Sequence, residues 1–277
     1  MTGTYKAPGS EQAVAFLHIP KTGGTTLNSF LASQFSADET YEIMMRGMSW
    51  RVPRPLFIRR SLISFSKIRR LKSAFEQHRV RLVHGHFDMS LSERLPSNIR
   101  YFTLLRDPVE RAISHYYHYR RMITDPINPL AMRSSLVDWV TNIGLVEMDN
   151  GQTRRLAGAM NLPCGRVTPQ VFDRAKTNMA RYFSVVGLTE RFEESLILLQ
   201  HQFGWPLCRL RALNVGEDRP QRTDVSEEVL RIIRDCNRFD SSLYQFASEL
   251  LDQALSKIDM ANELGRLRFA PHLGAQR

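Results

Sequence analysis

The turn Pro20–Thr26, PKTGGTT, has the residue types of an anion site and joins an apolar run to an amphipathic one. Lys21 carries a fixed positive charge, and the glycines let the backbone approach an anion closely. The first N–H groups of a following helix lack intrahelical partners and favour negative charge. The turn therefore predicts an anion site made by Lys21, Thr22, Gly23, Gly24, Thr25 and Thr26, with an ordinary solvated turn as the alternative. Because the lysine precedes the glycines, this is not a Walker A loop.

Two histidines at the end of a second apolar run are candidates for proton transfer. His84 and His86 flank Gly85 in the segment 80–87, and residues two apart in a strand project to the same face. An imidazole, with an ordinary pKa of about 6.5, suits proton abstraction at neutral pH. Each histidine has a purely structural role as its alternative. No further ligand stands at a suitable spacing, so a metal is not predicted.

A third candidate position follows the apolar run 101–105. Asp107 is a suitable N-cap, Pro108 suits the first helical turn, and Glu110 stands where a capping box needs it. The segment therefore predicts a strand, a sharp junction at Arg106, and a helix that runs to about residue 121.

Arg106 and Ser114 lie on this strand and helix. The carboxyl ends of parallel strands form the ligand crevice of an α/β sheet, so Arg106 is expected on the same rim as the Lys21 turn. Ser114 follows two turns into the helix. The alternatives are an ion pair with a nearby acid for Arg106 and a tolerated helix serine for Ser114.

The elements that must position these residues follow from hydrophobic periodicity. Apolar runs predict strands at 14–17, 80–87, 101–105 and 182–188, and helical spacing predicts helices at 62–77, 107–121, 136–146, 190–202, 225–236 and 240–258. Segments 36–55, 122–135 and 213–222 are expected to be loops, the first of them with short helical pieces. The pattern predicts an α/β, P-loop-like three-layer fold with a central mainly parallel sheet flanked by helices and a helical C-terminal part. We expect a single domain over 1–277, with a core at 13–250 and flexible termini at 1–12 and 262–277.

The composition is that of a soluble globular protein, with 43% hydrophobic and 24% charged residues. There is no apolar run long enough for a membrane span and no secretory signal at the N-terminus. Cys164, Cys208 and Cys236 are too few and too scattered for a disulfide framework or a zinc site. The sequence therefore predicts a cytoplasmic protein without a metal.

The net charge of +10 is concentrated in the segment 51–81, which holds ten Lys or Arg residues against one acid. This imbalance favours an anionic partner such as an acidic glycan, a glycolipid surface or nucleic acid, and a solvated helical face is the alternative. The aromatic residues Phe57, Phe65 and Phe75 have the spacing of core anchors and not of a base-stacking platform. We therefore do not expect nucleic acid as the partner.

Three motifs together resemble those of the PAPS-dependent carbohydrate sulfotransferases, particularly the branch of heparan sulfate 2-O-sulfotransferase. They are PKTGGTT after the first strand, HGH after a later strand, and LLRDPVERAISHYY. Three further segments also resemble that family: NGQTRRLAG at 150–158, VGLTERFEES at 186–195 and NRFDSSLY at 237–244. The resemblance spans roughly residues 13 to 250.

The resemblance implies a role for each matching residue. Lys21 matches the lysine that contacts the phosphosulfate, with Thr22 to Thr26 as the cradle, and Arg106 with Ser114 matches the pair that holds the 3′-phosphate. His86 matches the catalytic base and His84 its companion. Arg154 and Arg219 are candidate substrate or supporting residues, and the loop 213–222 either closes over the nucleotide through Arg219 or Arg222 or is a plain surface loop. The family's Golgi members have a membrane anchor and a disulfide-bearing C-terminal region that are not seen here, which favours a bacterial-type soluble member.

The sequence thus predicts sulfuryl transfer from PAPS to a hydroxyl of a carbohydrate or glycoconjugate, with PAP as product and no metal. Two other classes stay open. A P-loop kinase would share the strand, anion loop and helix but needs a Walker A loop and Mg²⁺ ligands. A non-catalytic binder of acidic glycans would explain the basic segment but not the set of Lys21, His86, Arg106 and Ser114.

Overall fold

The computed structural model describes residues 13–44, 73–75, 77, 79–206, 208–210 and 222–271. Arg219 lies outside these residues. So do most of the predicted helix at 62–77 and most of the basic segment 51–81.

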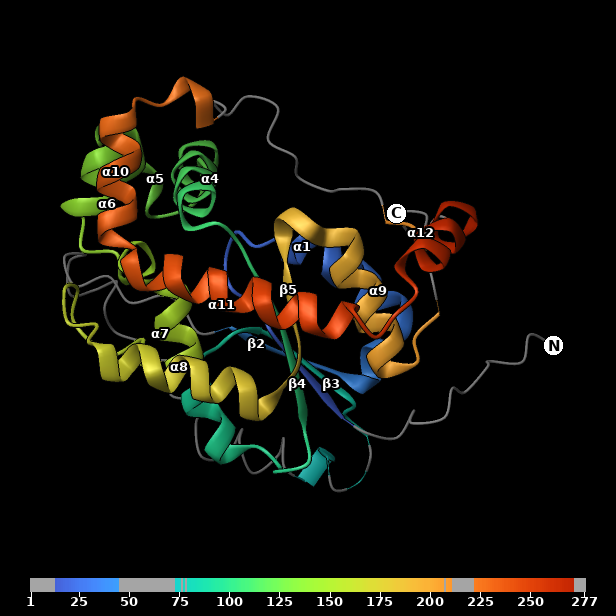
Figure 1. Ribbon diagram of the computed structural model, residues 1–277. Helices are drawn as coiled ribbons and strands as arrows, with labels where there is room; N and C mark the ends of the chain where they lie inside the picture. Colours follow the sequence, from blue (N-terminus) through green and yellow to red (C-terminus); the bar gives the residue numbers. More distant parts are fainter. Residues whose placement is uncertain are drawn as a thin grey trace.

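A five-stranded parallel sheet forms the centre of the described chain, in the order β2-β3-β1-β4-β5 (Figure 1). Its strands are β1 (Val14–Leu17), β2 (Thr40–Met44), β3 (Leu82–His86), β4 (Arg100–Leu105) and β5 (Phe183–Leu188). All four residues of β1 are buried, as expected for a parallel strand covered on both faces. The predicted α/β class with a parallel sheet is confirmed, and the turn after β1 lies between the ends of β3 and β4.

Strand β2 corrects the prediction of a loop over 36–55. Thr40–Met44 pairs with β3 at the edge of the sheet, and Met44 lies opposite His86. The strand is short and carries an exposed glutamate, Glu42, so its hydrophobic pattern is weaker than that of the buried strands.

Ten α-helices surround or extend the sheet in the described residues (Figure 1). They are α1 (Gly24–Gln34), α4 (Pro108–Arg121), α5 (Asn128–Arg133), α6 (Leu136–Thr141), α7 (Gly151–Ala157), α8 (Pro169–Tyr182), α9 (Phe192–Phe203), α10 (Glu227–Cys236), α11 (Arg238–Leu255) and α12 (Met260–Phe269). Helix α5 lies in a segment predicted to be a loop because of its prolines. Helix α12 occupies the first half of the C-terminal stretch that was expected to be flexible from residue 262.

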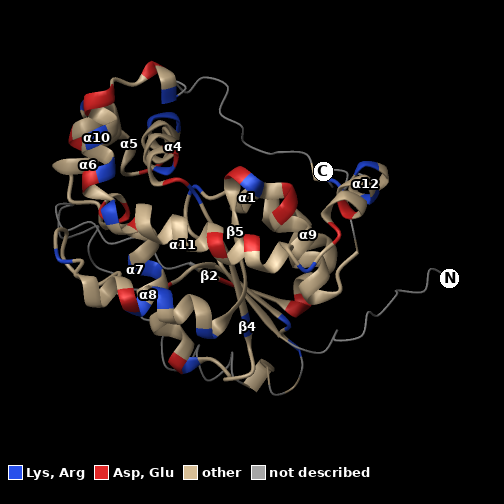
Figure 2. Cartoon of the chain, in the orientation of Figure 1, with Lys and Arg blue, Asp and Glu red and all other residues tan. Residues whose placement is uncertain are grey.

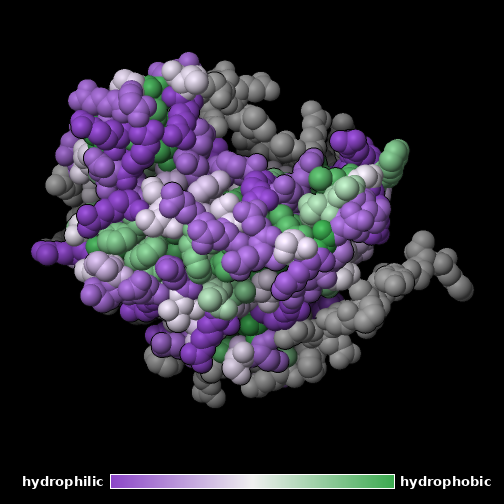
Figure 3. Space-filling model, in the orientation of Figure 1, coloured by the Kyte–Doolittle hydropathy of each residue, from purple (hydrophilic) through white to green (hydrophobic). Residues whose placement is uncertain are grey.

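Two hydrophobic clusters hold these elements together. The larger one lies around the sheet and includes residues of α1, α8, α9 and α11. The second joins α4, α6 and α10, which gather beyond the carboxyl ends of the central strands (Figure 1). In Figure 3 hydrophobic residues are visible where α8 and α11 run side by side, and there the rings of Phe172 and Phe239 are 5.7 Å apart. The second cluster therefore packs α4 against α6 and α10.

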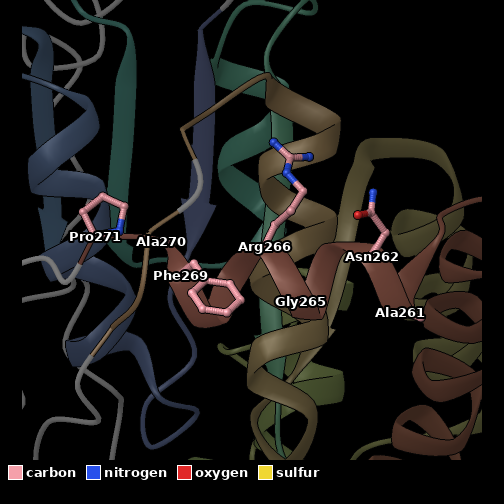
Figure 4. A pocket seen from close by; sticks show the side chains of 7 residues that line it. All are labelled: Ala261, Asn262, Gly265, Arg266, Phe269, Ala270 and Pro271. Atoms are coloured by element: carbon pink, nitrogen blue, oxygen red, sulfur yellow. The ribbon is translucent and has the colours of Figure 1, made fainter.

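The exposed surface mixes charges of both signs, and Figure 2 shows acidic and basic residues interspersed over the helices. A shallow hollow follows one side of α12, where Ala261, Gly265 and the 90% exposed Phe269 lie along one helical face (Figure 4). None of the helices in the described ranges combines the length and the apolar character that a bilayer crossing requires.

Candidate functional site

The turn after β1 has a left-handed backbone at two residues and leads directly into α1. Lys21 and Gly23 have φ angles of 69° and 80°, and α1 begins at Gly24. Thr22 is buried and its hydroxyl donates to the Ile19 carbonyl at 2.8 Å, so this hydroxyl closes the turn. Thr25 is exposed. Of the predicted cradle, the hydroxyl of Thr22 is therefore used within the protein.

Gly24 is required by a histidine that the sequence analysis did not single out. A Cβ atom at Gly24 would lie 1.8 Å from Nε2 of His18, whose ring packs against the start of α1. Burial, with smaller contributions from His86 and Arg155, holds the pKa of His18 well below its ordinary value. His18 is therefore a neutral packing partner of the turn at neutral pH.

His86 lies at the end of β3 beside this histidine. The Nδ1 atom of His86 is 2.9 Å from the His18 carbonyl oxygen, and the two rings are 4.4 Å apart. A carbonyl only accepts, so Nδ1 carries the proton and the neutral ring keeps a basic lone pair on Nε2. Burial and the charge of Arg155 lower the pKa of His86. The geometry gives His86 the tautomer and neutral state that a general base needs.

His84 shares a face of β3 with His86, as predicted from their spacing. Both side chains are partly buried, and burial lowers the pKa of His84. His84 lies opposite Glu42 of β2 and Phe16 of β1 in the sheet.

Arg106 lies just beyond β4, and its guanidinium reaches the turn after β1. Its Nη1 donates to the Lys21 carbonyl at 3.2 Å. The side chain also lies 3.5 Å from Glu110 and 3.8 Å from Glu190. The prediction that Arg106 and the Lys21 turn share one rim is confirmed, and the ion pair with an acid that was its alternative role is present as well.

The start of α4 differs from the predicted capping box. The Asp107 carboxylate accepts from the N–H groups of Val109 and Glu110 at 3.0 Å, as an N-cap does. The Asp107 N–H donates to Glu190 at 3.2 Å, so a residue from beyond β5 fills the place predicted for Glu110. Tyr244 of α11 in turn donates to Glu190 at 2.9 Å.

Ser114 is partly buried on α4, and His118 follows it by one helical turn. Burial, followed by the charge of Lys21, lowers the pKa of His118 to about 4. The Lys21 charge also contributes, as the smallest of the causes, to the lowered pKa of His18.

A cluster of buried charged side chains connects the anion turn with the end of β3. Glu147 is 6% exposed and accepts from both Arg155 and Arg111, the latter pair at 3.3 Å. Arg155 also donates to the Phe87 carbonyl at 3.0 Å, directly after His86, and Arg111 donates to the Pro20 carbonyl at 3.4 Å. Burial opposes ionisation of Glu147, but the two arginines prevail and lower its pKa to about 2. The cluster ties the histidine strand and the anion turn to one carboxylate.

Arg154 does not face a substrate. Its side chain is fully buried, pairs with Asp149 and donates to the carbonyls of Leu162 and Pro163 at 2.8 and 2.9 Å. Of the two roles considered for Arg154, the structure excludes substrate contact and leaves a supporting one. Sequence alone did not reveal this, because burial of an arginine depends on partners brought by the fold.

Of the predicted nucleotide loop 213–222, only Arg222 lies in the described residues. Its Nη1 is 3.8 Å from the Asp107 carboxylate at the start of α4. No group of three or more His, Cys, Asp or Glu side chains in the described ranges has the arrangement of a metal site. The hollow along α12 and a second cavity of about 330 Å³ beside α10 contain none of the predicted site residues.

Comparison with known proteins gives relatives of one activity class. The chain is 28% identical to human heparan-sulfate 6-O-sulfotransferase 1, over 88% of this chain and 66% of the relative. It is 26% identical to heparan-sulfate 6-O-sulfotransferase 2 of Danio rerio, over 88% of this chain and 58% of the relative. The chain thus spans less than two-thirds of the length of these relatives. They are named as 6-O-sulfotransferases, so the 2-O branch named from the motifs is not specifically supported.

A solved structure gives a weaker likeness. The mouse sulfotransferase SULT7A1 complexed with PAP is 14% identical, with a TM-score of 0.38, over 84% of this chain and 65% of that chain. This score is too low to support a conclusion about fold or ligand.

The sequence pattern that defines the Sulfotransferase family matches residues 10–247. This range contains the anion turn, both histidines of β3, Arg106 and Ser114. It also contains the segments around Gln152, Glu190 and Asp240 that surround them. The chain belongs to the Sulfotransferase family.

Proposed function

We propose that the protein transfers a sulfuryl group from PAPS to a hydroxyl of a carbohydrate or glycoconjugate. The observation that carries this proposal is that the anion turn, His86 and Arg106 lie together at one edge of the sheet. Two hydrogen bonds link these groups. Arg106 donates to the Lys21 carbonyl at 3.2 Å, and Nδ1 of the neutral His86 donates to the His18 carbonyl at 2.9 Å, which leaves Nε2 as the basic nitrogen.

The residues at this edge suit a nucleotide with phosphates at both ends. Lys21 and the first N–H groups of α1 would hold the phosphosulfate end. Arg106 and Ser114 would hold the 3′-phosphate, with Arg106 exchanging its contacts to Glu110 and Glu190 for that anion. The bound nucleotide supplies an electrophilic sulfur with a phosphate leaving group.

The chain's own groups act on charge and on one proton in this proposal. Nε2 of His86 takes the proton of the acceptor hydroxyl as its oxygen bonds to sulfur. Lys21 and the helix N-terminus stabilise the negative charge on the phosphate oxygen that the sulfur leaves. The residues around the turn would hold the nucleotide so that the acceptor hydroxyl could attack in line with the leaving oxygen, as phosphoryl transfer requires.

We infer an anionic glycan as the acceptor class. The relatives are named for heparan sulfate. Met44, which ends β2, pairs with His86, and the basic residues of segment 51–81 follow Met44 in the sequence. Incubating labelled PAPS with heparan sulfate, other glycans and glycolipids, then mapping the labelled hydroxyl, separates 6-O from 2-O transfer and carbohydrate from lipid acceptors.

Calorimetry with PAP and ATP in EDTA tests the proposed function. We expect PAP to bind without metal and ATP to bind far more weakly, because Arg106 and Ser114 select the 3′-phosphate. Binding of ATP alone, seen only after Mg²⁺ replaces the EDTA, would favour a phosphotransferase instead. Binding of neither nucleotide, with retention on a heparin matrix, would favour a glycan binder.

Replacing Arg106 by alanine is expected to raise the Kd for PAP about 10- to 100-fold, since hydrogen bonds to a charged phosphate contribute about 1.5–3 kcal/mol. Arg100→Ala is the matched control, because Arg100 begins the same strand at its opposite end and bonds Ser184 at 3.0 Å. Titration calorimetry measures both. Equal affinities of the Arg106 variant and wild type would remove Arg106 from the nucleotide site.

The acid limb of kcat/KM should report His86. Burial and Arg155 lower its pKa below the ordinary 6.5, so the base stays deprotonated further into the acid range. We expect kcat/KM for the acceptor, measured at acceptor concentrations well below KM, to fall only below pH 6.5. An acid limb at or above 6.5 would contradict the assignment of this base.

A further inference from the structure

Gln152 of α7 pairs with the backbone of Arg106 through both ends of its amide group. Its Oε1 accepts from the Arg106 N–H at 2.9 Å, and its Nε2 donates to the Arg106 carbonyl at 2.9 Å. Gln152 is fully buried. Arg106 lies between the end of β4 and the start of α4, where neither the sheet nor the helix pairs its backbone N–H and carbonyl. The Gln152 side chain forms the hydrogen bonds that these two groups need.

Gln152 is itself held from the C-terminal part of the chain. The buried Asp240 of α11 accepts from the N–H groups of Gln152 and Thr153 at 3.1 and 2.7 Å and from the Thr153 hydroxyl at 2.8 Å. A carboxylate at this position satisfies the free donors at the start of α7 and complements its dipole. The amide of Gln152 therefore projects from a fixed backbone.

The position of the Arg106 backbone decides where its guanidinium lies. The side chain already spans to the Lys21 carbonyl at 3.2 Å, and Lys21 has a left-handed φ of 69°. A shift of the Arg106 main chain would move the fork and loosen this contact with the anion turn. Both halves of the nucleotide clamp thus depend on one junction residue.

We propose that Gln152 is a positioning residue for donor-nucleotide binding, acting through Arg106. It touches no substrate. It fixes the main chain from which the Arg106 guanidinium is aimed at the 3′-phosphate. The inference rests on the proposed function and assigns a role to the segment Asn150–Gly158 that its resemblance to the family did not specify.

Replacing Gln152 by methionine tests the proposal, because methionine has a similar length and forms neither bond. We expect the Kd for PAP, and the KM for PAPS, to rise about 10-fold, as when interactions with a charged group are misaligned, while kcat at saturating PAPS stays within about 3-fold. In an Arg106→Ala background the same substitution should change the Kd less than about 2-fold, since coupled residues are not additive. Gln152→Leu, which is also apolar and forms neither bond, should raise the Kd to a similar extent and serves if the methionine variant does not fold.

Gln200→Met is the matched control. Gln200 is a buried glutamine of α9 that donates to the Pro206 carbonyl at 2.8 Å, outside the site. We expect this variant to lower Tm without changing the Kd for PAP. A Gln152→Met protein that loses Tm but keeps the wild-type Kd would overturn the positioning role, and additive effects in the double variant would overturn the route through Arg106. Failure of the wild-type protein to bind PAP would be a failure of the proposed function instead.

Discussion

Replacing His86 by alanine is expected to lower kcat by about 10²- to 10⁴-fold and to leave the Kd for PAP nearly unchanged. The reason is that the two ring nitrogens of His86 have different roles. Nδ1 of His86 is committed to the His18 carbonyl, so the free Nε2 is the atom available to take the acceptor proton. Steady-state turnover with labelled PAPS and calorimetry with PAP measure the two quantities separately.

Two variants make this result specific. His86→Asn can keep a donor toward the His18 carbonyl but has no basic nitrogen, so it should be as slow as the alanine variant. His201→Ala removes a histidine of α9 that is 43% exposed and lies 3.5 Å from Glu263, and it should keep full turnover. Wild-type turnover in either His86 variant would show that another group accepts the proton.

Replacing Glu147 by glutamine is expected to lower the free energy of unfolding by about 3–5 kcal/mol, the cost of leaving buried charges without their partner. The substitution keeps the size of the side chain but removes the charge that balances Arg111 and Arg155. Urea denaturation followed by circular dichroism measures the loss.

The control for Glu147 is an exposed pair. Glu227 of α10 bonds Arg234 at 2.6 Å and is 76% exposed, so Glu227→Gln should change stability little. The pKa of Glu147 is lowered to about 2, so its contribution is present above its ordinary pKa of 4.5 and is lost as the pH falls toward 2. Equal stability losses in the two variants would show that the buried cluster is not a stabilising unit.

Local signals were sufficient to predict the elements that carry the site. Continuous apolar runs predicted β1, β3, β4 and β5, because strands of a parallel sheet are buried on both faces. Asp107 and Pro108 predicted the start of α4, since capping is encoded within one helical turn. The meeting of Arg106 with the Lys21 turn followed from the rule that parallel strands end at the same edge.

The residues that support the site could not be found in the same way. Arginine is usually a surface residue, so the sequence does not reveal that Arg111, Arg154 and Arg155 are buried. Their burial depends on ion pairs with Asp149 and Glu147, which only the fold brings close. His18 was missed because its importance depends on the close approach of Gly24. Edge strand β2 was missed because it is short and half polar.

The dependence of Gln152 on Asp240 has a consequence for how the protein is made. Hydrogen bonds that join residue 21 to 106, 106 to 152 and 152 to 240 connect the turn after β1 to Asp240 of α11. During synthesis the anion turn and β4 leave the ribosome long before α11 does. Contacts between distant parts of a chain form slowly. The junction at Arg106 therefore reaches its final geometry only after α11 has been made and packed.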